Sequence, residues 1–67
     1  LKPHELTMVD LLMLGKSNKE MAPLLKLSLR GVESRLAGIM RKMGAESRFQ
    51  LGKLVEHARR VLEAERT

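Results

Sequence analysis

Residues 15–22 read GKSNKEMA and decide the fold, because they join two helical segments through a tight connection. Gly15 is suited to the left-handed conformation that ends a helix. Ser17 and Glu20 have the spacing of a capping box, in which the hydroxyl accepts from the third helical amide and the carboxylate accepts from the amide of the cap. Two helices joined by two or three residues that include a glycine predict a helix-turn-helix unit.

The stretches before and after this connection have helical rather than alternating spacing of apolar residues. Pro3 suits the first turn of a helix, where its missing N–H would be unpaired anyway. Apolar residues then recur at helical intervals as Leu6, Val9, Leu12 and Met13. In the helix that begins after Ser17, Pro23 removes one donor and crowds the carbonyl of Lys19, so we expect this helix to be short or bent.

A third helix is predicted over residues 29–43, with Ser28 as its N-cap and Gly44 at its end. One side of it is apolar and contains Leu29, Val32, Leu36, Ile39, Met40 and Met43. The opposite side is small and basic and contains Arg30, Ser34, Ala37, Gly38 and Arg41. A glycine within a helix costs about 1 kcal/mol relative to alanine, so Gly31 and Gly38 suggest close approach by a partner.

A fourth helix is predicted from Glu46 and Ser47 to about Ala64. Its apolar positions are Leu51, Leu54, Val55, Ala58, Val61 and Leu62. These exceed what three short neighbouring helices can cover, so the far end of the helix should meet something outside this chain. We expect residues 63–67 to fray. The predicted fold is all-α, a four-helix bundle that contains a helix-turn-helix, and residues 1–67 form one domain.

The composition excludes several classes of protein. The chain has 67 residues, 43% of them hydrophobic, and therefore room for one small core. It has no cysteine, which excludes disulfides and thiolate metal sites and is typical of a cytoplasmic protein. The longest apolar run, residues 11–14, is far shorter than the roughly 20 residues of a membrane span.

Catalysis and metal binding have little support in the sequence. His4 and His57 have no neighbouring Ser or Cys in a nucleophile arrangement, and no spacing of His and carboxylates resembles a metal site. We therefore predict that the chain is not an enzyme, and expect no catalytic residue, metal, cofactor or small-molecule ligand. The single aromatic residue, Phe49, argues against a stacking platform for single-stranded nucleic acid.

The net charge of +5 favours a polyanionic partner, and it is concentrated in residues 26–48, which carry six bases and two acids. A slim, basic third helix can enter the major groove of double-stranded DNA. Arg30 and Ser34 are then candidates for base edges. Candidates for phosphate contacts are Lys26, Ser28, Arg35, Arg41 and Lys42.

Other interpretations of the basic helix stay open at this point. A solvated basic face has the same pattern, and basic amphipathic helices also lie on membranes or on partner proteins. Glu33 fits several roles, because it could accept a hydrogen bond from a cytosine amine, pair with Arg30 or repel phosphate.

Two stretches of the chain resemble a known family. Residues 12–22 and 27–32, followed by residues 42–45 and Arg48 and preceded by Leu1, Pro3 and Glu5, are similar to the LuxR-type helix-turn-helix domain, also called the FixJ or NarL type. The resemblance implies the C-terminal output domain of a bacterial transcription regulator, with the third helix in the major groove. It also implies that Glu5 is a buried structural acid and that Arg48 anchors the fourth helix.

The resemblance further implies a homodimer through the fourth helix. The residues that would make this contact are Val55, Ala58, Val61 and Leu62. The partners that we expect are therefore double-stranded DNA and a second copy of the chain, with no membrane contact.

The chain departs from the family at positions that contact DNA in relatives. Gly31-Val32-Glu33 stands where Thr-Val-Lys is common, and Ala37 stands where some relatives have a base-reading lysine. Arg30, Ser34 and Arg35 are therefore the expected substitutes for the base contacts of relatives, and Glu33 and Ala37 are further base-contact candidates. Lys19 in the second helix joins the phosphate candidates. The alternative function is a protein-interaction module that keeps the fold but has lost or weakened DNA binding.

Overall fold

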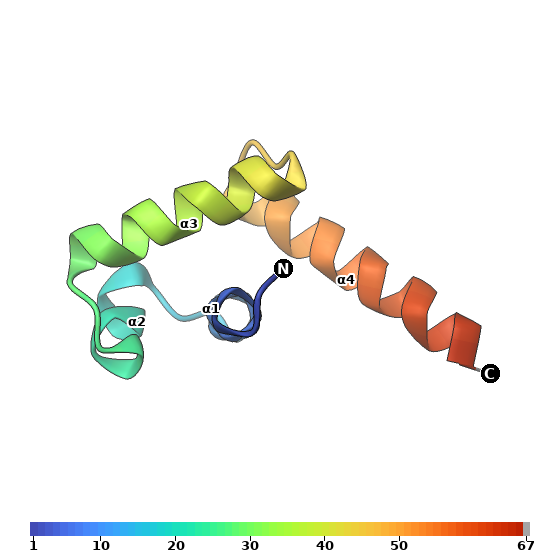
Figure 1. The fold of residues 1–67 in the computed structure, drawn as a ribbon, viewed down its shortest axis with the longest axis horizontal. Helices are drawn as coiled ribbons and strands as arrows, with labels where there is room; N and C mark the ends of the chain where they lie inside the picture. The colour runs from blue at the N-terminus through green and yellow to red at the C-terminus, as the bar shows by residue number, and fades with distance from the viewer. Residues whose placement is uncertain (67) are drawn as a thin grey trace.

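The computed structural model describes residues 1–66, in which four helices and no strand occur: α1 (Pro3–Met13), α2 (Asn18–Leu25), α3 (Leu29–Met43) and α4 (Arg48–Arg66). In Figure 1, α1 and α2 lie below α3, and α4 runs away from them toward the C-terminus. The predicted all-α class is confirmed. The fraying expected for residues 63–67 stays a prediction: α4 continues to Arg66, and Thr67 lies outside the described residues.

Local hydrogen bonds explain where α2 and α3 begin. The amide of Ser17 donates to Glu20 Oε1 at 2.9 Å, and the amide of Glu20 donates to Ser17 Oγ at 3.2 Å, which completes the predicted capping box. The hydroxyl of Ser28 accepts from the amide of Gly31 at 3.0 Å. The helix α2 is short, at eight residues, and continues through Pro23.

The first three helices end in the same way. Each is followed by a residue with positive φ, whose successor donates its amide to a carbonyl five residues back. The three residues with positive φ are Gly15 at 86°, Lys26 at 57° and Gly44 at 69°. Lys26 is the one residue of the three that is not glycine. Its backbone is strained, because a Cβ atom is crowded at positive φ and glycine has none.

The core lies where the four helices meet. Its buried residues are Met8 and Val9 of α1, Met21 of α2, Val32, Leu36 and Ile39 of α3, and Leu51 and Val55 of α4. The expected inward face of α1 is partly wrong, because Leu6 and Met13 are exposed and Met8 is buried. Apolar residues occupy most of the circumference of α1, so helical spacing alone did not select one face. Leu29, in the first turn of α3, is also 39% exposed.

An ion pair joins α1 to α3. The buried carboxylate of Glu5 accepts from Lys42 Nζ at 2.9 and 3.1 Å and from the amide of Lys2 at 2.9 Å. These bonds lower the pKa of Glu5 to about 2, the Lys42 hydrogen bond being the largest cause. Glu5 therefore has the structural role that the resemblance implied.

Candidate nucleic-acid interface

The outer face of α3 is free of other elements of the chain. Arg30, Glu33, Ser34, Ala37 and Arg41 are all exposed, while Val32, Leu36 and Ile39 on the opposite side are buried in the core. Figure 1 shows α3 along the upper edge of the molecule, with α1 and α2 on its inner side. The fold therefore presents the small, basic side of α3 outward.

The arginines of α3 have no partner within residues 1–66. Arg30, Arg35 and Arg41 make neither a hydrogen bond nor an ion pair there, although Arg35 is half-buried. Two arginines of α4 differ from these: the guanidinium of Arg59 pairs with Asp10, and that of Arg60 pairs with Glu56. The guanidinium groups on α3 thus keep their donors available for an external acceptor.

The surface of α3 is narrow as well as basic. A Cβ atom added at Gly38 would meet nothing within 4 Å except Arg41 Nη2 at 3.9 Å, so packing inside the chain does not require a glycine there. Gly31 is different, because an added Cβ would lie 3.3 Å from Ser28 Oγ, the oxygen that caps α3. Contacts within the fold therefore favour glycine at position 31, whereas at position 38 they leave room for a larger residue.

The predicted phosphate contacts outside α3 flank it at two points. Lys19 is exposed in the first turn of α2. Lys26 is exposed in the turn from α2 to α3, and Ser28 follows it as the cap of α3. We call these residues and the exposed candidates of α3, taken together, the α2–α3 face. Its members are Lys19, Lys26, Ser28, Arg30, Glu33, Ser34, Arg35, Ala37 and Arg41.

Lys42 differs from the other phosphate candidates. Its ammonium group binds the carboxylate of Glu5, and half of its side chain remains exposed. The direction of the side chain follows from its place on α3, because residue 42 is on the side that faces α1. The structure therefore gives Lys42 a contact within the fold that the sequence pattern did not reveal.

Within residues 1–66, no three side chains of His, Asp or Glu lie close enough together to hold a metal ion. No helix in that range is long and apolar enough to cross a membrane.

A comparison with known families relates this arrangement to other proteins. The profile of the luxR family of bacterial regulatory proteins matches residues 1–55. The chain belongs to this family. No curated protein and no solved structure gave a match. The family is one of regulatory proteins and not of enzymes.

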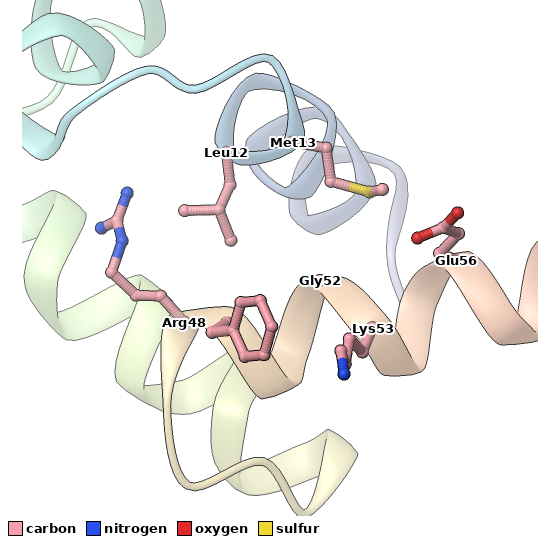
Figure 2. Close-up of a pocket in the computed structure, with 7 residues that line it drawn as sticks. Leu12, Met13, Arg48, Gly52, Lys53 and Glu56 are labelled. Carbon is pink, nitrogen blue, oxygen red and sulfur yellow. The ribbon is translucent and has the colours of Figure 1, made fainter.

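In this luxR-family chain, Arg48 ties the start of α4 to the helix-turn-helix. Its guanidinium donates to the side-chain oxygen of Asn18 and, at 3.1 Å, to the carbonyl of Lys16. Figure 2 shows the Arg48 side chain reaching from α4 toward the connection between α1 and α2. The anchoring role that the resemblance implied is confirmed, and the side-chain oxygen of Asn18 is occupied inside the fold.

A shallow hollow beside Arg48 was not predicted. It is lined by Leu12 and Met13 of α1 and by Arg48, Phe49, Gly52, Lys53 and Glu56 of α4. Phe49 is 73% exposed, and the ammonium of Lys53 lies 4.8 Å from the centre of its ring. None of the residues that line the hollow belongs to the α2–α3 face. The only signal in the sequence was an aromatic residue off the apolar stripe of α4.

The predicted dimer contacts of the luxR-family chain divide into two groups. Ala58, Val61 and Leu62 are exposed on the part of α4 that extends beyond the core. Val55 is instead 5% exposed and belongs to the core of the chain itself, so its assignment as a dimer contact is wrong. Apolar residues in the first part of α4, up to Val55, are packed in the core, whereas those from Ala58 onward are exposed to solvent.

Proposed function

We propose that this chain binds double-stranded DNA in a sequence-specific manner, as the output domain of a bacterial transcription regulator. In this proposal α3 lies in the major groove, and the rest of the α2–α3 face contacts phosphates. Cytoplasmic location follows from the nature of the partner. The observation that carries the proposal is the outer face of α3, which nothing else in residues 1–66 covers and whose arginines have no partner among those residues.

The shape of α3 supports this proposal. An α-helix with its side chains is about 10–12 Å across, and the major groove is about 12 Å wide. Small side chains at Ser34, Ala37 and Gly38 keep the middle of α3 slim. The helix can therefore approach base pairs closely, with Arg30 and Ser34 near its N-terminal end facing base edges.

The distribution of charge also supports DNA binding by the α2–α3 face. The helix α3 carries four basic residues and one acid. Lys19 and Lys26 add positive charge at the two ends of α2, the helix that lies below the N-terminal end of α3 in Figure 1. A duplex bound by this face releases counterions from its phosphates, which gives binding a steep dependence on salt.

Titration of fluorescent duplexes at two salt concentrations tests the proposal. We expect affinity to fall by roughly tenfold or more when salt rises from 50 to 200 mM, because several phosphate contacts each release counterions. A flat salt response would contradict duplex binding and would favour the alternative of a protein-interaction module.

Two variants on α3 and one control sharpen this test. Arg41→Ala should weaken binding to all duplexes and reduce the salt slope by about 1, as expected for a phosphate contact. Arg30→Ala should change sequence preference, as expected for a base contact. Lys53→Ala removes the same charge from α4, away from the α2–α3 face, and should leave both properties nearly unchanged.

The proposal includes a homodimer through α4. Ala58, Val61 and Leu62 expose an apolar surface on the free end of this helix, and a second copy can cover it. A two-fold dimer would present two α3 helices to grooves about one DNA turn, roughly 34 Å, apart. The target site would then be partly palindromic.

A further inference from the structure

Glu33 is the only carboxylate on α3, and its side chain is exposed on one flank of the outer face. Its carboxylate makes no ion pair or hydrogen bond within residues 1–66. Arg30, three residues earlier, has the spacing for a pair on the helix surface, but the two are not paired. Glu33 therefore has both oxygens free on the face that the proposed function directs toward DNA.

A carboxylate on a surface that binds DNA is unfavourable unless it makes a specific contact in the complex. The surrounding phosphates repel a carboxylate, so Glu33 weakens binding to DNA in general. The fold of residues 1–66 does not need it either, since its side chain is exposed and binds no other group in that range. A directed hydrogen bond to a base that donates into the groove would offset the repulsion.

The chemistry of the major groove selects that base. An ionised carboxylate only accepts hydrogen bonds. Guanine presents the acceptors O6 and N7 there, and thymine presents O4, so both repel it. Adenine offers the N6 amine beside the acceptor N7, whereas cytosine offers the N4 amine alone. Cytosine is therefore the best partner for the carboxylate.

We propose that Glu33 is a specificity-determining residue that selects a cytosine in the DNA site. This inference rests on the proposed function and adds the identity of one base to it. Residues 30 and 33 are three positions apart, about 4.5 Å along α3, which is close to the spacing of about 3.4 Å between base pairs. Arg30, whose guanidinium favours guanine, then contacts the same base pair or the next one.

Selection from random duplexes by the 67-residue chain tests this inference. The wild-type chain should enrich cytosine at one position of the site, and another base there should lower affinity about fivefold to one-hundredfold. Glu33→Gln should shift that position toward adenine, because a glutamine amide bonds both N6 and N7. Glu33→Ala should lose the cytosine preference without gaining one for adenine.

A matched control is available on α4. Glu63→Gln makes the same change of charge at another exposed position, and it should leave the selected sequence unchanged. Circular dichroism of each variant checks that the helices are intact. The exposure of Glu33 makes a folding defect in its variants an unexpected result.

Two results would overturn the inference. One is the same selected sequence for the wild-type chain and Glu33→Gln. The other is a gain of affinity by Glu33→Gln that is equal for all duplexes, which would show that Glu33 only repels phosphate. With either result, steep salt dependence in the wild-type chain would leave the proposed function intact, whereas absence of duplex binding would overturn both.

Discussion

At the scale of single residues, Glu5 links stability to pH. It is the one buried charged side chain in the described part of the chain, and its carboxylate accepts from Lys42 and from the amide of Lys2. Its pKa is lowered from 4.5 to about 2, so the folded state favours the ionised form. The stability that this gives is present above pH 4.5 and is lost as the pH falls toward 2.

We therefore predict that Glu5→Gln lowers the melting temperature at pH 7 and that its difference from the wild-type chain shrinks as the pH falls toward 2. Thermal unfolding followed by circular dichroism over this range measures the effect. The pKa of Glu20 is also lowered, by its bonds with Ser17, so the variant should keep part of its acid sensitivity. If the melting temperatures of the two chains differed by the same amount at all pH values, the lowered pKa of Glu5 would be contradicted.

Lys26 provides a second prediction at this scale. Its φ of 57° is unfavourable for a side chain and costless for glycine, so Lys26→Gly should stabilise the fold by about 1 kcal/mol. If Lys26 contacts phosphate, the same variant should bind duplexes more weakly. Denaturant unfolding and duplex titration together check the prediction, and Lys53→Gly, which removes a lysine within α4, should instead destabilise the fold.

At the scale of elements, α3 and α4 each contain a glycine that packing does not require. A Cβ atom at Gly52 would meet nothing within 4 Å, and one at Gly38 would meet only the Arg41 side chain. A helical glycine is less favourable than alanine by about 1 kcal/mol. The two positions differ in that Gly38 lies on α3, next to the proposed DNA contact.

We predict that Gly38→Ala and Gly52→Ala each raise the free energy of unfolding by about 0.5–1 kcal/mol. Only Gly38→Ala should weaken duplex binding, because its methyl group would widen α3 where it approaches the groove. Chemical denaturation and duplex titration measure the two effects. Equal duplex affinity for both variants would argue against close approach at Gly38.

At the scale of the whole molecule, α4 makes the chain elongated, with extents of 40 × 22 × 20 Å. Its first half closes the core through Leu51 and Val55, and its second half carries exposed apolar residues away from the core. Leu62 is 59% exposed there. An uncovered apolar surface on a small chain favours association.

Leu62→Glu should therefore reduce self-association, as measured by sedimentation over a range of concentrations. It should also weaken binding to duplexes with two half-sites more than to duplexes with one. The melting temperature at low concentration should change little, since residue 62 lies outside the core. Loss of binding to single half-sites would instead point to a defect in folding.

Much of the fold was predictable because its signals are local. The capping box of Ser17 and Glu20, the cap at Ser28 and the glycines at positions 15 and 44 act within one helical turn, so sequence spacing is sufficient to recognise them. The apolar stripe of α3 was largely correct for the same reason. The inward face of α1 was predicted less well, because leucine, methionine and valine occur around most of that helix.

Much less of the candidate site was predictable. Exposure of Arg30, Ser34 and Arg41 was expected from the wheel of α3 and is found in the structure. The partner of Lys42 lies 37 residues away, and the partners of Arg48 lie 30 and 32 residues away, so their spacing carries no signal. The anchoring role of Arg48 came from the family resemblance.

The amino-acid sequence by itself determined where the first three helices begin and where α3 ends, and it concentrated positive charge around α3, since both properties depend on neighbours along the chain. Only the tertiary structure decided which basic groups stay free for a partner, and that Val55 belongs to the core while Leu62 reaches solvent. These outcomes depend on how the four helices pack, because packing brings distant residues together and determines which surface remains uncovered.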